Sequence, residues 1–121
     1  MIFSGGRIMF NRVFTEVKRS NFDAFLIQNR DNMNWLCRRD NYEIPGMAIV
    51  TKENIFIFTK SRNFEAIRVL YSEFQVVYGG LDKVWEICNS HKIGRLGFEE
   101  NKTSITAYKT MQETLNGIEL V

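Results

Sequence analysis

The sequence predicts an α/β fold in which a layered, mixed β-sheet is packed against flanking helices. Short apolar segments alternate along the chain with amphipathic helical patterns, an order typical of α/β domains. Two of these segments are separated only by Lys52 and Glu53, which predicts a hairpin and so at least one antiparallel strand pair. The chain has 121 residues, enough for one domain with one hydrophobic core.

The chain is expected to open with a helix and a strand. Between Met9 and Ser20 the apolar residues recur at helical spacing, and these are Phe10, Val13, Phe14 and Val17. Residues 23–28, "DAFLIQ", form an apolar run of the length of a buried strand. The following segment, Asp31 to Gly46, contains the only proline of the chain, and we expect it to be an irregular joint.

A hairpin, a helix and another strand are predicted next. The hairpin strands are Met47 to Thr51 and Asn54 to Thr59. Ser61 is expected to cap the helix, whose inner face carries Phe64, Ile67, Leu70 and Tyr71. Residues 74–78, "FQVVY", read as a strand that Gly79 and Gly80 end.

Two further helix–strand units complete the pattern. A helix is predicted over residues 81–91, with Trp85 and Cys88 in the core, followed by a strand at 94–99. Thr103 or Ser104 can cap the last helix, whose expected inner face is Ile105, Tyr108, Met111 and Leu115. Residues 118–121 begin a final strand. No internal repeat or low-complexity segment interrupts this order.

Composition excludes several classes of protein. Sixteen basic and fourteen acidic residues leave a formal charge of +2 without any basic run, which argues against a nucleic-acid partner. Cys37 and Cys88 lie far apart and form no CxxC motif, so neither a zinc site nor a disulfide framework is expected, and both are read as reduced thiols. No apolar run approaches the roughly 20 residues that span a bilayer. We therefore expect a cytoplasmic protein without a membrane segment.

No pattern in the sequence predicts a self-contained catalytic or metal site. His91, the single histidine, falls at a helix end, where a surface role is expected. Glu99 and Glu100 are adjacent on an extended segment, so their side chains should point to opposite faces instead of converging. The serines lie in no nucleophile-elbow motif.

The irregular segment offers one candidate binding site. Trp35 beside Arg38 and Arg39 could hold a carboxylate or peptide ligand by stacking and bidentate hydrogen bonds. In the other reading, Trp35 and Leu36 plug the edge of the sheet while both arginines are solvated. The sequence leaves both readings open.

Several segments together resemble the N-terminal domain of the creatinase, prolidase and aminopeptidase P family. These are "NFDAFLIQNRDNMNWL", "GMAIVTKENIFIFTKSRNFEAI", "FQVVYGG" and "KIGRLGFEENKTSITAYKTMQETLNGIELV". Family members typically read, in the same order, a "DALLI" strand, a "YLTG" segment, a hairpin ending in "TDSRY" and a "GFE" strand before a "T-x-x-x-Y" helix. The resemblance covers residues 9–121, so residues 1–8 are interpreted as an N-terminal extension. Lys60 replaces the usual Asp, whereas Ser61 and Arg62 are retained.

This resemblance implies a three-layer α/β domain similar to the ribonuclease H-like motif, placed before a C-terminal "pita-bread" catalytic domain. That second domain, absent from this chain, would carry two Asp, one His and two Glu holding two divalent metal ions (Mn, Co or Zn). The resemblance also implies a homodimer in which the N-terminal domain helps to shape the substrate pocket. Candidate pocket or interface contacts are Trp35, Arg38, Arg39, Asn41, Tyr42, Glu43 and Arg62.

The expected function is therefore that of a non-catalytic domain of an Xaa-Pro dipeptidase or aminopeptidase P-like metallopeptidase, with a peptide or small molecule as the substrate of the parent enzyme. Two alternatives remain. The parent could be a catalytically inactive relative in which this fold is a binding module, or a creatinase-like hydrolase or lyase. The sequence downstream of Val121 would discriminate the first alternative, since an active enzyme needs the metal ligands.

Overall fold

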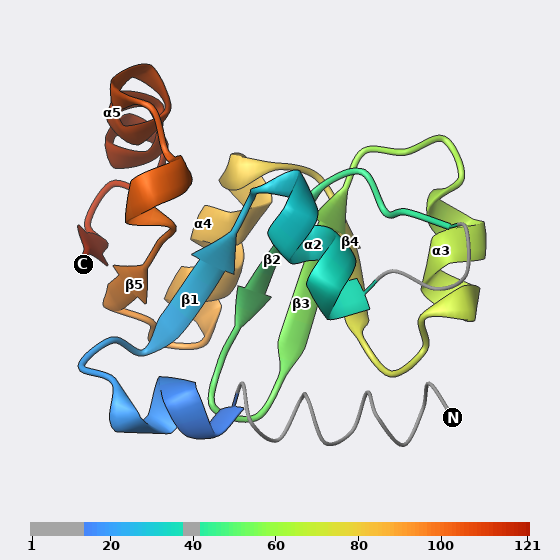
Figure 1. The fold of residues 1–121 in the computed structure, drawn as a ribbon, viewed down its shortest axis with the longest axis horizontal. Helices are drawn as coiled ribbons and strands as arrows, with labels where there is room; N and C mark the ends of the chain where they lie inside the picture. Colours follow the sequence, from blue (N-terminus) through green and yellow to red (C-terminus); the bar gives the residue numbers. More distant parts are fainter. Residues whose placement is uncertain (1–13, 38–41) are drawn as a thin grey trace.

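The computed structural model describes residues 14–37 and 42–121, in which a six-stranded mixed sheet lies between two layers of helices (Figure 1). The strand order is β4-β3-β2-β1-β5-β6. Of these strands, β2 alone runs antiparallel to its neighbours. The strands are β1 (Ala24–Ile27), β2 (Met47–Val50), β3 (Ile55–Thr59), β4 (Gln75–Tyr78), β5 (Arg95–Gly97) and β6 (Glu119–Leu120). The predicted three-layer α/β fold is confirmed.

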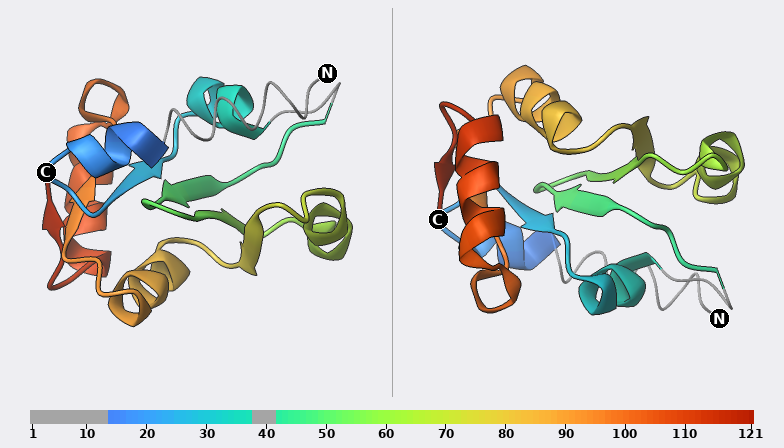
Figure 2. Two further views of the ribbon diagram at one scale, coloured as in Figure 1. Left: turned by 90° about the horizontal axis from the view of Figure 1, so that it is seen from below. Right: turned by 90° about the horizontal axis from the view of Figure 1, so that it is seen from above.

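Helices cover both faces of the sheet (Figure 2). A helix over residues 14–19 shares one face with α2 (Arg30–Cys37) and α3 (Phe64–Leu70), because their buried residues belong to one core cluster. The other face carries α4 (Leu81–Ser90) and α5 (Ile105–Thr114), whose buried residues form the second cluster. A short 3₁₀ helix, η1 (Glu100–Lys102), connects β5 to α5. The first part of the predicted helix over residues 9–20 lies outside the described residues.

Side chains of the central strands alternate between the two core clusters. In β3, Ile55 and Ile57 pack against the α2–α3 layer, while Phe56 and Phe58 pack against the α4–α5 layer. All five residues of β3 are buried, as expected of a strand covered on both faces. This explains why the sequence reads there as a continuous apolar run.

The predicted hairpin is confirmed, with Met47 opposite Phe58 and Val50 opposite Ile55. Its Lys-Glu turn pair is unusual, and the adjacent Thr51 supplies the missing turn chemistry. The Thr51 hydroxyl accepts hydrogen bonds from the backbone N–H groups of Glu53 at 3.3 Å and Asn54 at 2.9 Å. A side chain thus replaces the glycine that such turns commonly use.

The prediction of an irregular joint over residues 31–46 was wrong in its first half, where α2 forms. Met33, Leu36 and Cys37 have the spacing of one helix face and are all buried. Asn29 precedes the helix, and its side-chain oxygen accepts a hydrogen bond from the N–H of Asn32 at 3.1 Å, which is an N-cap contact. The several asparagines concealed this helix because their intrinsic helix propensity is low.

Other helix predictions need correction at their ends. Ser61 does not cap α3: its hydroxyl accepts from the N–H of Asn63 at 3.0 Å in a turn, and the helix begins at Phe64. Ile105, the first residue of α5, was expected to face inward but is 78% exposed. Trp85 is also exposed, and its ring N–H donates to the Asn116 carbonyl at 2.9 Å. Leu70 likewise faces outward.

In the part of the chain that the structure describes, no helix has the length and apolar character needed to cross a membrane.

Candidate functional site

The carboxyl ends of the parallel strands meet at one rim of the sheet, beside the start of antiparallel β2. In open α/β sheets, ligands bind outside the carboxyl ends of the strands. Two hollows open along this rim, and Pro45 and Gly46 contribute to the walls of both. We call this region the carboxyl rim, and it is the best candidate for a functional site among the described residues.

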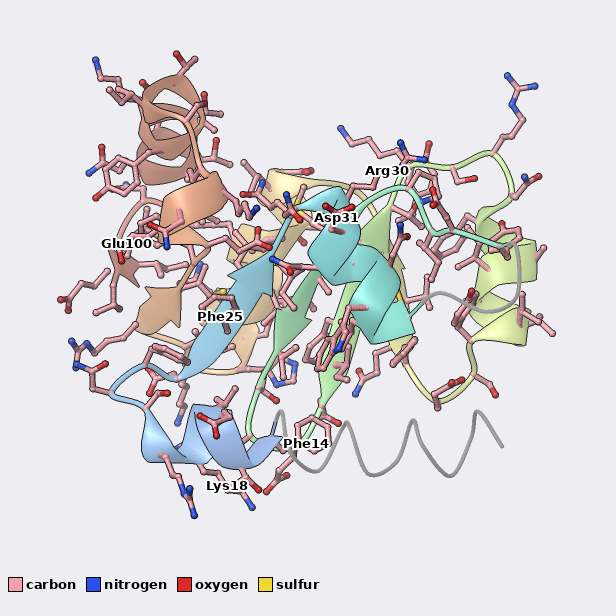
Figure 3. All side chains as sticks on the ribbon, viewed as in Figure 1. Phe14, Lys18, Phe25, Arg30, Asp31 and Glu100 are labelled. Atoms are coloured by element: carbon pink, nitrogen blue, oxygen red, sulfur yellow. The ribbon has the colours of Figure 1, made fainter. Side chains whose placement is uncertain are left out.

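The first hollow, of about 470 Å³, lies between α2 and the segment that leads into β2. Arg30 at the start of α2 reaches toward that segment (Figure 3) and pairs with Glu43 through an Nη2–Oε2 distance of 3.0 Å. The second carboxylate oxygen of Glu43 accepts a hydrogen bond from the Asn34 side chain, also at 3.0 Å. Glu43 thus ties the approach to β2 onto α2 and fixes one wall of the hollow.

A buried carboxylate, Glu99, holds the start of α2 in place. One of its oxygens accepts hydrogen bonds from the backbone N–H groups of Gln28 at 2.7 Å and Asn29 at 2.9 Å. The other accepts from the side-chain amide of Asn32 at 2.6 Å. A negative charge at a helix N-terminus is also favourable toward the helix dipole. Sequence reasoning missed this role: it expected an extended strand through Glu99, whereas β5 ends at Gly97 and the exposed Glu100 begins η1.

The second hollow, of about 730 Å³, opens where β3 and β4 end and α4 begins. Gly46 has φ of +156°, and a Cβ atom there would overlap the Phe58 carbonyl oxygen, so only glycine fits this wall. The Thr59 hydroxyl donates to the Pro45 carbonyl at 2.6 Å and joins the end of β3 to the approach to β2. The floor between the two hollows is therefore rigid.

The second hollow also carries charge. The Asp82 carboxylate accepts a hydrogen bond from the Gly80 N–H at 3.2 Å, and this bond lowers the pKa of Asp82 below its ordinary value. Lys60 lies on the same hollow, and its positive charge lowers the pKa of Asp82 further. Lys60 thus supplies a cation beside a carboxylate whose charged form is favoured.

Those predicted contact residues that the structure describes do not gather in one place. Glu43 lies on the carboxyl rim, and Arg62 is exposed in the turn that follows Ser61. The Tyr42 ring packs against the Tyr71 ring, with 6.3 Å between centroids. Arg38, Arg39 and Asn41 lie outside the described residues.

Trp35 stands apart from the rim. It is 53% exposed and lines a separate hollow of about 320 Å³ together with Phe22 and Phe25. The reading in which both Trp35 and Leu36 plug the sheet edge is therefore wrong for Trp35. Leu36 alone is buried, because the helical turn directs the two neighbouring side chains to different sides.

The described side chains do not fit a two-metal centre. The Asp23 carboxylate accepts hydrogen bonds from the backbone N–H groups of Gly94 and Arg95, both at 3.0 Å. The Glu99 carboxylate likewise already accepts hydrogen bonds from N–H donors on both of its oxygens. Within residues 14–37 and 42–121, no group of three His, Cys, Asp or Glu side chains could hold a metal ion. His91 is exposed at the end of α4, as predicted, with its ring centroid 5.0 Å from that of Phe56.

Both cysteines are buried, and neither forms a disulfide. Burial raises the pKa of the Cys88 thiol to about 12, because desolvation penalises the thiolate. The Cys37 thiol donates to the Met33 carbonyl at 3.0 Å within α2. These contacts give both cysteines a packing role.

Comparison with known proteins assigns the family. The sequence pattern of the creatinase/prolidase N-terminal domain matches residues 10–121. The chain belongs to the creatinase/prolidase N-terminal domain family. The match extends across the strands and helices described above, so the carboxyl rim is part of the family domain. A comparison with curated proteins gives no match.

Solved structures share the fold of this family member. A Streptococcus pyogenes Xaa-Pro aminopeptidase structure superposes with a TM-score of 0.84 at 22% identity, covering 98% of this chain and 92% of that chain. The N-terminal domain of the cytoplasmic peptidase PepQ from Mycobacterium tuberculosis gives 0.77 at 19% identity, covering 93% and 89%. An Xaa-Pro dipeptidase from Bacillus anthracis gives 0.81 at 17% identity and 96% of this chain, which spans only 33% of that longer chain.

Proposed function

We propose that this chain is the non-catalytic N-terminal domain of a cytoplasmic Xaa-Pro dipeptidase or aminopeptidase P-like metallopeptidase. In that enzyme it would shape the substrate pocket and support formation of a homodimer. The observation that carries the proposal is the family match over residues 10–121, together with a fold shared with domains of Xaa-Pro peptidases. The reaction itself would belong to a separate C-terminal pita-bread domain.

The division of labour is supported by the chemistry of the carboxyl rim. Its carboxylates are engaged as hydrogen-bond acceptors or in ion pairs, which suits them to hold walls in position. Two divalent metal ions, when bound by the ligands of the catalytic domain, would activate the attacking water. The rim would then contribute a rigid surface that limits which peptides reach those ions.

Glu43 is the rim residue best placed for this role. Its contacts with Arg30 and Asn34 fix the start of the segment leading into β2, and the neighbouring Ile44 is buried at 5% exposure. Residues that hold a substrate or limit its length act through such fixed positions, because a displacement of about 1 Å can cost a large factor in rate. Replacement of Glu43 should therefore alter substrate preference in the full-length enzyme.

The test compares this 121-residue chain with the full-length natural protein, each supplied with Mn²⁺ or Co²⁺ and Xaa-Pro dipeptides. We expect turnover only by the full-length protein. Glu43→Gln in the full-length enzyme should change kcat/KM for longer Xaa-Pro peptides relative to dipeptides, whereas Glu100→Gln, an exposed control, should not. Turnover by the 121-residue chain would contradict the proposal. An inactive full-length protein would favour the binding-module alternative, and turnover of a small carboxylated substrate in place of peptides would favour creatinase-like chemistry.

A further inference from the structure

A short turn joins α5 to β6 at the outer end of the sheet (Figure 1). The Ile118 N–H donates to the Leu115 carbonyl at 3.1 Å, which closes a β-turn with Asn116 and Gly117 at its two central positions. Gly117 has φ of +87°, as the third residue of a type II turn requires. The turn therefore uses a glycine directly after an asparagine.

An asparagine followed by glycine is especially prone to spontaneous deamidation. In this reaction the backbone nitrogen of the following residue attacks the side-chain carbonyl carbon of the asparagine. Glycine leaves that nitrogen unshielded because it has no Cβ atom. Asn116 is the only asparagine in the sequence that glycine follows. The reaction also requires that the asparagine amide and the following N–H are exposed and free of other contacts.

Both reacting groups are free at this turn. Asn116 and Gly117 are exposed. Among the described residues, neither the Asn116 side-chain amide nor the Gly117 N–H has a hydrogen-bond partner, since the turn is closed by Leu115 and Ile118. A Cβ atom on Gly117 would meet no atom within 4 Å, so the space beside the attacking nitrogen is open. The Trp85 ring N–H binds the backbone carbonyl of Asn116 and leaves its side-chain amide untouched.

Asparagines elsewhere in the described chain are held by their surroundings. Asn89 is the most instructive comparison, because it is also exposed and a small residue, Ser90, follows it. Its side-chain amide donates to the Trp85 carbonyl at 2.9 Å. Both residues also lie inside α4, where backbone N–H groups bind carbonyls one turn back. The side-chain amides of Asn32 and Asn34 are bound to carboxylates.

We propose that Asn116 is a self-modification site at which the chain deamidates to aspartate and isoaspartate. The Gly117 nitrogen loses its proton and forms a bond to Asn116 Cγ, while the Cγ–Nδ2 bond breaks and ammonia leaves with that proton. Water then opens the cyclic imide. Opening at the side-chain carbonyl gives aspartate, and opening at the main-chain carbonyl gives isoaspartate. Water is the only co-reactant, and neither an oxidant nor a reductant is needed.

Isoaspartate would disturb the contacts that hold the turn and β6. The main chain then runs through the former side chain and is longer, and the carbonyl that accepts the Trp85 N–H becomes part of a free carboxylate. The new negative charge lies just beyond the C-terminal end of α5, where the helix dipole disfavours it. Strand β6 begins shortly afterwards, with the Glu119 N–H bound to the Gly94 carbonyl at 2.8 Å. We therefore expect the isoaspartate form to release β6 from β5.

Peptide mapping measures the reaction directly. Trypsin should place Asn89 on peptide 84–92 and Asn116 on peptide 110–121. The folded chain is aged in heavy-oxygen water at mildly alkaline pH, so that each deamidation adds one heavy oxygen atom, and is then digested. Asn116 should convert at least about tenfold faster than Asn89, because glycine leaves the attacking nitrogen open. Its products should separate into aspartate and isoaspartate peptides. Equal rates at the two sites, or an unconverted peptide 110–121, would overturn the proposal.

Hydrogen exchange of residues 118–121 tests the release of β6. These amides should exchange at least about tenfold faster in the isoaspartate form than in the fresh chain, because local opening of the strand becomes easier. Asn116→Gln, whose longer side chain would have to close a larger ring, is the control and should keep its protection on ageing. Circular dichroism should show that both chains are folded.

Unchanged protection in the isoaspartate form, or an equal loss of protection in aged Asn116→Gln, would overturn the release of β6. The inference goes beyond the proposed function, because no peptide substrate and no metal ion takes part in the reaction. Xaa-Pro turnover by the full-length protein therefore tests the proposed function separately.

Discussion

The Glu99 carboxylate accepts a hydrogen bond from the backbone N–H of Gln28 at 2.7 Å, although the two residues lie 71 positions apart in the sequence. The same carboxylate also receives the N–H of Asn29 and the amide of Asn32. One side chain therefore connects the end of β1, the cap of α2 and the segment that follows β5. Its loss should loosen the whole carboxyl rim.

We expect Glu99→Gln to lower the free energy of unfolding by about 1–3 kcal/mol, because an amide cannot accept all three hydrogen bonds and its NH₂ group faces a donor. Urea denaturation followed by circular dichroism measures the change. Glu100→Gln, at the exposed neighbouring position, should stay within about 0.5 kcal/mol of the wild type. Equal losses in both variants would show that the hydrogen bonds of Glu99 are not the cause.

Replacement by alanine should cost more stability at Leu36 than at the neighbouring Trp35, although tryptophan is the larger residue. Leu36 is 4% exposed and Trp35 is 53% exposed. Leu36→Ala leaves a core cavity and should cost about 2–5 kcal/mol. Trp35→Ala should cost less than about 1 kcal/mol, because about half of the residue is already exposed to water. Thermal unfolding of the two variants decides the matter, and a larger loss for Trp35→Ala would place its ring in the core.

The rate at which the cysteine thiols react should show whether they are buried in the core. With the pKa of Cys88 raised to about 12, only about one molecule in 10⁴ carries the thiolate at pH 8. The folded protein should therefore react very slowly with a disulfide reagent, and both cysteines should react at once in denaturant. Raising the pH toward 12 should accelerate labelling as the thiolate forms. Fast labelling of Cys88 at pH 8 without denaturant would contradict its burial.

The lowered pKa of Asp82 makes a stabilising contribution that depends on pH. Because the folded state favours the carboxylate, this contribution is present above the ordinary carboxyl pKa of 3.8 and is lost as the pH falls through the lowered value. Asp82→Asn should therefore melt slightly below the wild type at pH 7 and together with it at strongly acidic pH. Melting curves at the two pH values test this, and a difference that persists in acid would have to come from another interaction.

Local patterns were enough to predict most of the architecture. Apolar runs identified β1, the β2–β3 hairpin and β4, and of these β1, β2 and β3 are buried in a sheet covered on both faces. Helical spacing identified α4 and α5. One failure arose where a residue's environment is set from far away, because the start of α2 is held through Asn32 by Glu99, 67 positions along the chain. Trp85 was misplaced because its exposed ring is bound to the carbonyl of Asn116, in the turn after α5.

The candidate site was less accessible to sequence reasoning. Glu43 was singled out only through the resemblance, and its pairing with Arg30 depends on the unpredicted α2. The second hollow joins residues from β2, β3, α4 and α5, which are distant in sequence. Gly46 could have been a signal, since a glycine beside a proline before a buried strand often marks a constrained backbone.

The long-range contact of Glu99 also concerns the order in which the protein is made. Strands β2, β3 and β4 find their partners within one stretch of chain, and β1 can pair with β2 as soon as that hairpin exists. By contrast, β5 and Glu99 come late in the sequence. Only when they have been made can β1 pair with its second neighbouring strand, β5, and can Glu99 bind the start of α2. During synthesis, the rim around Arg30 and Glu43 therefore stays incomplete until the ribosome has passed residue 99.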